Sequence, residues 1–208
     1  RLGVEQNPAA RRRRRVLVGV AVEARLRVGR VGREHAVELL ERRGERELDL
    51  EVALHGRRYV ECAQEAQRDA FETYLEPAMK RAGYEALFTQ KSREAMGAAG
   101  KVDGCATFWK AQKYRVAEQR ELRFNDLAYA EARANRLSER DEHAYLTRLV
   151  KDNVAQLLVL EDYPAPGRRS RRLAVANTHL YSHRDFPDAK LWQSLSLIRQ
   201  LDAFCNRQ

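Results

Sequence analysis

The stretch NTHLYSHRDFPDAKLWQ, residues 177–193, places two histidines and an asparagine directly after an apolar run. Asn177 and His179 stand two residues apart, so on a strand their side chains point to the same side. A histidine there can donate to a phosphate oxygen or act as an acid near neutral pH. The competing interpretation is a core histidine that bonds to the backbone. Because the apolar run predicts a buried strand, we expect the cluster at a strand end, where ligands bind in open α/β sheets.

Glu65 is a second candidate, because it ends an apolar stretch in CAQEAQ and stands before a predicted helix. A carboxylate in that place can hold a hard divalent cation such as magnesium, which takes oxygen ligands and keeps several waters for a substrate phosphate. The alternative is that Glu65 has no role in binding and only stabilises the helix, because an acidic residue in the first turn interacts favourably with the helix dipole.

Further polar residues flank the predicted strands. Lys151, Asp152 and Asn153 precede an apolar strand, where they could donate to a phosphate or a sugar, or merely form a turn. His183 could contact RNA from its loop, although exposed loop histidines usually have no function. A zinc site at His179 and His183 is disfavoured, because no cysteine or third ligand lies near them in the sequence.

Composition indicates one globular domain. The chain has 208 residues, of which 44% are hydrophobic and 33% charged. The sequence contains no run of about 18 apolar residues, the length that could span a bilayer. The three cysteines are far apart and form no CxxC pair, which favours neither a disulfide framework nor a zinc site. We therefore expect a reducing compartment, the cytoplasm or the nucleus.

The net charge of +9 is unevenly distributed, with +6 in residues 1–60 and +3 in the remainder. The five consecutive arginines of Arg11–Arg15 indicate a solvated basic arm rather than a localisation signal or a phosphate-binding patch. Near residue 60 the chain changes from arginine alone to mixed lysine and arginine. This change divides an Arg-rich segment, 1–58, from a domain, 59–208.

The pattern of apolar residues predicts an α/β fold. In the first segment it predicts a strand over 16–22, a helix over 32–44 and a strand over 48–54. A helix over 67–84 is expected to break or kink near Glu76, because Pro77 lacks the N–H that continues a helix and would clash with the preceding turn. Strands follow at 84–90, 102–110, 114–124, 154–163 and 171–179, with a helical excursion over 125–152.

The last helix begins near residue 188. Leu191, Leu195, Ile198 and Leu201 follow one another at spacings of 4, 3 and 3, and this periodicity predicts the face that packs on the sheet.

Five sequence blocks, in the same order and with compatible spacing, resemble the carbon-catabolite-repressor-type deadenylases of the endonuclease/exonuclease/phosphatase superfamily, with nocturnin-like and angel-like relatives. The resemblance covers residues 59–208. It implies a DNase-I-like, two-sheet α/β sandwich flanked by helices, and magnesium-dependent 3′-5′ removal of AMP from poly(A) tails. The blocks are AQEAQRDAFETYLEPAMKRAGYEALF, KVDGCATFWK, ELRFNDLA, LVKDNVAQLLVLE and LAVANTHLYSHRDFPDAKLWQ.

The resemblance also implies roles for single residues. It places the metal on Glu65 and the phosphate site at Asn177 and His179, and it places the loop through His183 and Pro187 near the RNA end. These assignments agree with the chemistry of the residue types. Phosphodiester hydrolysis builds up negative charge and needs a stronger nucleophile than water, and a metal that polarises the phosphate and activates a water supplies both.

The family's closing blocks, a GDFN-type and an SDH-type block, do not occur in these 208 residues. We therefore expect a C-terminally truncated, partial catalytic domain. Two other functions stay open, a 2′-phosphodiesterase of the same superfamily and a catalytically silent RNA-binding or scaffold protein. The expected partner is the poly(A) 3′ end of RNA and no membrane. A deadenylation complex has no LxxLxL docking pattern to support it here.

Overall fold

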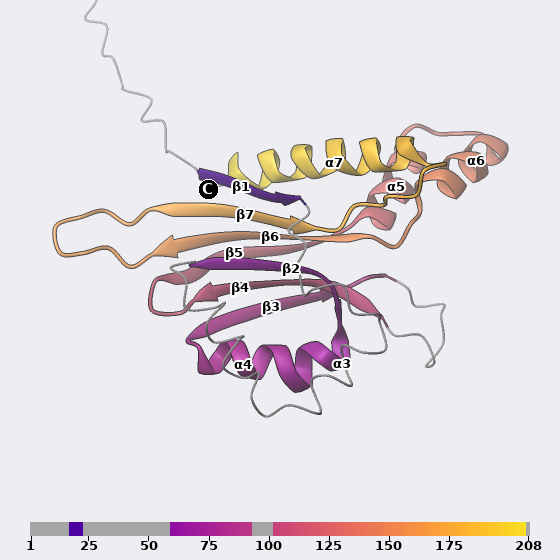
Figure 1. Cartoon of the computed structure of the whole chain (residues 1–208). Helices are drawn as coiled ribbons and strands as arrows, with labels where there is room; N and C mark the ends of the chain where they lie inside the picture. Colours follow the sequence, from indigo (N-terminus) through magenta and orange to yellow (C-terminus); the bar gives the residue numbers. More distant parts are fainter. Residues whose placement is uncertain (1–16, 23–58, 93–101, 207–208) are drawn as a thin grey trace, which may run out of the picture.

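The computed structural model describes residues 17–22, 59–92 and 102–206. Two β-sheets pack face to face, and helices cover their outer faces (Figure 1). The expected α/β sandwich of two sheets is confirmed. The predicted helix at 32–44, the strand at 48–54 and the basic run Arg11–Arg15 lie outside the described residues.

The first sheet has the strand order β1-β7-β6-β5. β1 runs parallel to β7, and the other pairs are antiparallel. Residues 157–160 are all buried in β6, as their unbroken apolar run predicts for a strand covered on both faces. β1 shows that the Arg-rich segment contributes a strand to this sheet. The strands are β1 (Leu17–Val22), β5 (Tyr114–Arg123), β6 (Val154–Asp162) and β7 (Arg172–Thr178).

The second sheet has the antiparallel order β2-β4-β3. Its central strand passes so close to its neighbour that a Cβ at Gly104 would lie 2.2 Å from the Thr89 carbonyl oxygen, so only glycine fits there. Trp109 packs between the sheets against Leu158 and Val175. The strands are β2 (Val60–Gln67), β3 (Tyr84–Gln90) and β4 (Asp103–Lys110).

A helical run follows β2 and covers the outer face of the second sheet, where Phe71 and Met79 pack against Phe108. The helix does not break near Glu76, because the backbone stays helical there and a π-helical stretch passes directly into an α-helix with Pro77 in its first turn. Gly83 then leaves the helix with φ of +78°. The run consists of α3 (Arg68–Ala70), η1 (Phe71–Leu75) and α4 (Glu76–Arg81).

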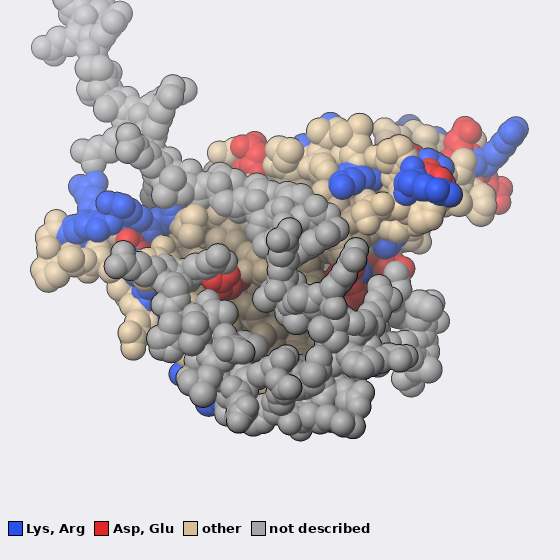
Figure 2. Space-filling model, viewed as in Figure 1, with Lys and Arg blue, Asp and Glu red and all other residues tan. Residues whose placement is uncertain are grey.

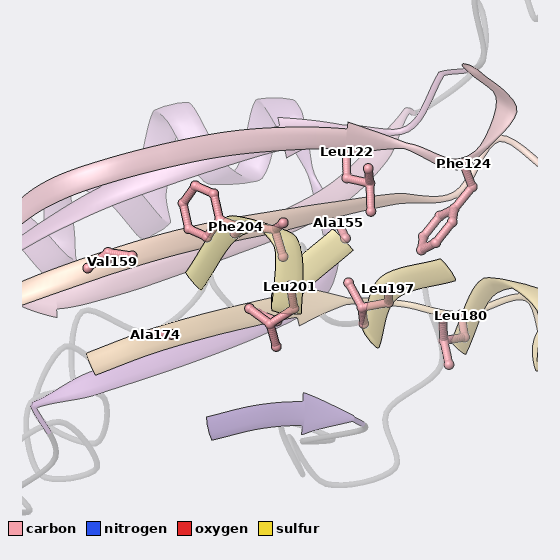
Figure 3. Packing of buried hydrophobic residues seen from close by; sticks show 11 residues of the cluster. Leu122, Phe124, Ala155, Val159, Ala174, Leu180, Leu197, Leu201 and Phe204 are labelled. Carbon is pink, nitrogen blue, oxygen red and sulfur yellow. The ribbon is translucent and has the colours of Figure 1, made fainter. Parts of the chain in front are cut away.

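Three helices belong to the other side of the sandwich. The Ser138 hydroxyl accepts from the Asp141 N–H at 3.2 Å and so caps α6. α7 lies along the outer face of the first sheet (Figure 1), and Leu197, Leu201 and Phe204 fill the space between them (Figure 3). The helices are α5 (Phe124–Ala134), α6 (Glu139–Leu149) and α7 (Pro187–Asn206).

The predicted buried face of α7 is wrong at three of its four positions. Leu191, Leu195 and Ile198 are 61%, 45% and 60% exposed, and Leu201 alone of the predicted set is buried. α7 carries apolar residues on two sides, so the 3.6-residue period is satisfied by either side and does not choose between them. The buried side of the helix consists of Ala189, Gln193, Ser196, Leu197, Leu201 and Phe204.

Candidate active site

An open pocket of about 660 Å³ lies where β2 and β7 end. Four of the six predicted site residues line it, from elements that are far apart in the chain. The other two, Asn177 and Pro187, do not line the pocket. Three cationic side chains, which sequence reasoning had not grouped in one site, also line it. The lining includes Glu65, Lys91, Lys151, Asn153, His179, His183 and Arg184.

Glu65 and His179 meet in this pocket, with Oε1 of the glutamate 3.6 Å from Nδ1 of the histidine. Glu65 sits at an irregularity of the β2–β4 ladder and has φ of 56°. A bulge of this kind turns one side chain out of the alternating pattern of a strand. The left-handed backbone strains a non-glycine residue, and such strain is typical of functional sites.

The imidazole of His179 has a buried nitrogen without a described hydrogen-bond partner. Its Nδ1 is buried and forms no hydrogen bond in the part of the chain that the structure describes. Such an atom normally has a partner. The nearby Glu65 carboxylate becomes an ion-pair partner when the imidazole is protonated.

Two buried amides hold the backbone of His179. Asn153 Nδ2 donates to the His179 carbonyl at 2.7 Å. Gln193 Nε2 donates to Asn153 Oδ1 at 3.0 Å, and Gln193 Oε1 accepts from the Tyr181 N–H at 2.8 Å. Gln193 was missed by sequence reasoning, and its signal is a glutamine on the buried face of α7. Asn153 lines the pocket, but its described bonds support His179. Its predicted contact with nucleic acid stays a prediction.

Asn177 lies beneath the pocket, fully buried between the two sheets. Its Nδ2 donates to the Ala106 carbonyl at 2.9 Å and lies 3.2 and 3.3 Å from Thr107 Oγ1 and Gln156 Oε1. Its Oδ1 has no hydrogen-bond partner among the described residues. Asn177 and His179 therefore both face the second sheet, at different depths. The predicted phosphate role of Asn177 remains a prediction for a residue outside the pocket lining.

Arg148 of α6 anchors the loop after His179 by donating to the Asp185 carbonyl at 3.2 Å. It also donates to both carboxylate oxygens of Asp188, in the first turn of α7, at 2.9 and 2.6 Å. Pro187 is the first residue of α7. His183 is exposed and stacks on Tyr181, with ring centroids 6.3 Å apart. His183 thus lies at the exposed rim of the pocket, whereas Pro187 lies outside the pocket lining.

The pocket is mainly cationic. Lys151 Nζ lies 4.0 Å from the centroid of the Phe186 ring. Burial, followed by the charge of Arg148, lowers the pKa of Lys151. Lys91 pairs with Asp103. Lys91, Lys151 and Arg184 all line the pocket, which suits an anionic substrate.

The pocket offers few side chains that could bind a metal ion. The described residues contain no group of three His, Cys, Asp or Glu side chains that could hold a metal ion. Glu65 is an exposed carboxylate in the described lining. Magnesium in proteins often relies on one or two carboxylates, several waters and substrate phosphates, so Glu65 fits one ligand position.

No family model matches the chain. It is 37% identical over 150 residues to carbon catabolite repressor protein 4 homolog 1 of Arabidopsis thaliana, covering 69% of this chain and 25% of that protein. It is 31% identical over 150 residues to the CCR4-Not complex 3′-5′-exoribonuclease subunit Ccr4 of Yarrowia lipolytica, covering 70% and 20%.

Among solved structures, the human nocturnin catalytic domain with bound sulfate aligns with a TM-score of 0.48 at 23% identity, covering 75% of this chain and 52% of that chain. The chain spans about a quarter of the length of its Arabidopsis relatives. No helix among the described residues is long and apolar enough to cross a membrane.

Proposed function

We propose, on the premise that this chain is related to the carbon-catabolite-repressor-type proteins over 69% of its length, that its pocket belongs to a magnesium-dependent 3′-5′ exoribonuclease. The proposed substrate is the poly(A) tail of mRNA, and the proposed extent is a partial catalytic domain over residues 59–208. A relative whose name includes 3′-5′-exoribonuclease supports the reaction class.

One observation carries the proposal, the approach of Glu65 and His179 from two different sheets in a cationic pocket. His179 is half-buried and held through its carbonyl, so its imidazole can donate to a phosphate oxygen from a defined position. Lys151 and Arg184 lie close enough to the same pocket to attract the RNA backbone.

Glu65 would hold the metal ion. Its strained backbone directs an exposed carboxylate into the pocket, where the ion keeps its water and phosphate positions. A bound divalent metal supplies polarisation of the phosphate and an activated water. The chain's own residues orient the RNA end and hold the histidine.

The test is cleavage of a 5′-labelled RNA ending in adenosines, with magnesium or with EDTA. We expect magnesium-dependent shortening from the 3′ end, slowed at least about 100-fold by Glu65→Gln. Glu72→Gln is the matched control, because Glu72 is an exposed carboxylate in η1, away from the pocket lining. An oligoadenylate with 2′-5′ linkages in the same assay separates the 2′-phosphodiesterase.

A second candidate is a silent RNA-binding relative. The lack of a three-ligand metal group in the described part of the chain favours it. Such a protein binds adenosine-rich RNA with strong salt dependence and leaves its length unchanged, with and without magnesium. The gel that tests cleavage therefore also decides between the two candidates.

A further inference from the structure

The β6–β7 hairpin lies at the opposite end of the first sheet from the pocket (Figure 1). Residues 163–170 of its loop are all exposed. The hairpin carries four arginines within five residues, and Arg115 of β5 lies beside it through its bonds to Glu161. We call this set the basic hairpin, consisting of Arg115, Arg168, Arg169, Arg171 and Arg172.

Its positive charge exceeds the local negative charge. Glu161 accepts from Arg115 at 3.1 and 2.7 Å, and Arg172 lies 3.6 Å from the same carboxylate. Arg168 lies 3.7 Å from Asp162. Both carboxylates are largely buried by these contacts, with side chains 12% and 6% exposed.

Two guanidiniums are left over. Arg169 and Arg171 form no ion pair with any residue that the structure describes, and Arg169 lies in the exposed loop. Figure 2 shows Lys and Arg side chains gathered at the hairpin end of the molecule. An excess of guanidinium groups on one exposed turn is the kind of surface that binds a phosphate backbone.

Exposed aromatic rings lie beside these cations. Tyr59 and Tyr163 are each 52% exposed. Lys113 connects them, because its Nζ lies 5.9 Å from the Tyr59 ring centroid and its carbonyl accepts from the Tyr163 N–H at 3.1 Å. Arginines that track a backbone next to rings on which bases stack are typical of surfaces for single-stranded nucleic acid.

The distance between the two surfaces suits one strand of RNA. β6 has nine residues from Val154, beside the pocket, to Asp162, at the hairpin. At about 3.3 Å per residue the strand is roughly 30 Å long, and stacked nucleotides at about 3.4 Å each cover that length in roughly nine steps.

We propose that the basic hairpin is a second RNA-binding surface, which holds the upstream phosphates of a single strand whose 3′ end lies in the pocket. The inference rests on the proposed function for the direction of the strand. Binding to the hairpin itself depends on neither cleavage nor metal.

The test is fluorescence anisotropy of labelled A20 and A5 with the 208-residue chain in EDTA, at several salt concentrations. The variant replaces Arg168, Arg169, Arg171 and Arg172 by Gln. We expect A20 binding to weaken at least about tenfold and its log–log salt slope to fall by up to about 2.8, from about 0.7 for each lost phosphate contact. Binding of A5, which is too short to span both surfaces, changes less than threefold.

The matched control replaces four other exposed arginines, Arg133, Arg136, Arg140 and Arg199, by Gln. Equal weakening by both quadruple variants would mean that only total charge matters, and would overturn the proposal. Because Arg168 and Arg172 contribute to ion pairs, the pair Arg169→Gln and Arg171→Gln serves as a milder variant. It should produce about half of the change in salt slope.

Two further outcomes are decisive. If anionic phosphatidylserine vesicles bind the chain through the same four arginines while A20 binding does not depend on them, the surface is for lipid and the proposal is wrong. In the second outcome, A20 binding depends on the hairpin while Glu65→Gln leaves the rate of RNA shortening equal to that of the wild type. In that case the hairpin proposal stands and the exoribonuclease proposal fails.

Discussion

Glu65 Oε1 lies 3.6 Å from His179 Nδ1, although 114 positions and two different sheets separate the residues. A bulge in β2 aims the glutamate, and the buried amides of Asn153 and Gln193 hold the backbone that carries the histidine. The pocket therefore depends on supports from β2, β7, α7 and the residues before β6.

Gln193→Leu should loosen the His179 backbone. The change leaves Asn153 Oδ1 and the Tyr181 N–H without their described partner, so the free energy of unfolding should fall by about 1–3 kcal/mol. Urea unfolding measures the loss. The imidazole NMR signals of His179 should shift while those of His143, on α6, stay in place. Gln200→Leu on the same helix is the control, and equal His179 shifts in both variants would contradict a positioning role.

Substitutions at two neighbouring positions on different sides of α7 should differ strongly in their effect on the free energy of unfolding. Leu197→Ala removes a buried side chain from the sheet-facing side and should lower the free energy of unfolding by about 2–5 kcal/mol. Ile198→Ala, at a position 60% exposed, should change it by less than about 0.5 kcal/mol. Chemical denaturation of both variants decides the orientation of the helix. A larger loss for Ile198→Ala would reverse it.

Asn177→Asp should destabilise the protein more at neutral pH than in acid. The residue is fully buried between the sheets, where a carboxylate would lack water, so at pH 7 the loss should reach about 3 kcal/mol or more. Burial raises the pKa of such a carboxyl, so its protonated form is tolerated and the loss shrinks as pH falls toward 4. Thermal unfolding at the two pH values measures this. A variant as stable as the wild type at pH 7 would place Asn177 in contact with solvent.

One half-buried thiol, Cys62, and one buried thiol, Cys105, predict a loss of stability in alkali. Burial raises the pKa of Cys62 and Cys105 from 9.0 to about 11. The folded protein thus keeps protons that the unfolded chain releases, so this contribution is complete below pH 9 and is lost as pH rises toward 11. Urea midpoints measured between pH 8 and 11 should fall, and less steeply in a Cys62→Ala, Cys105→Ala variant. Parallel curves for both proteins would exclude the thiols as the cause.

Local sequence predicted the strands well, because each is a short apolar or β-branched run between turn residues. It also placed Glu65 and His179 near strand ends. It did not predict the polar contacts between the sheets, since the bonds of Asn177 to Ala106 and Thr107 join segments about 70 residues apart. The prediction of the buried side of α7 failed for a different reason. Leu197 and Ile198 belong to two apolar stripes on the helix, and only packing on the sheet decides which stripe is buried.

The most direct measurement of the central claim is a double-mutant cycle on RNA shortening. The rates of the wild type, Glu65→Gln, His179→Ala and the double variant are compared on a 5′-labelled RNA with an adenosine tail, in magnesium. If both residues act on one RNA end, each single change slows shortening at least about 100-fold, and the double variant is hardly slower than the slower single one. Independent, multiplying effects, or 3′ shortening that persists in the double variant at the wild-type rate, would contradict the account.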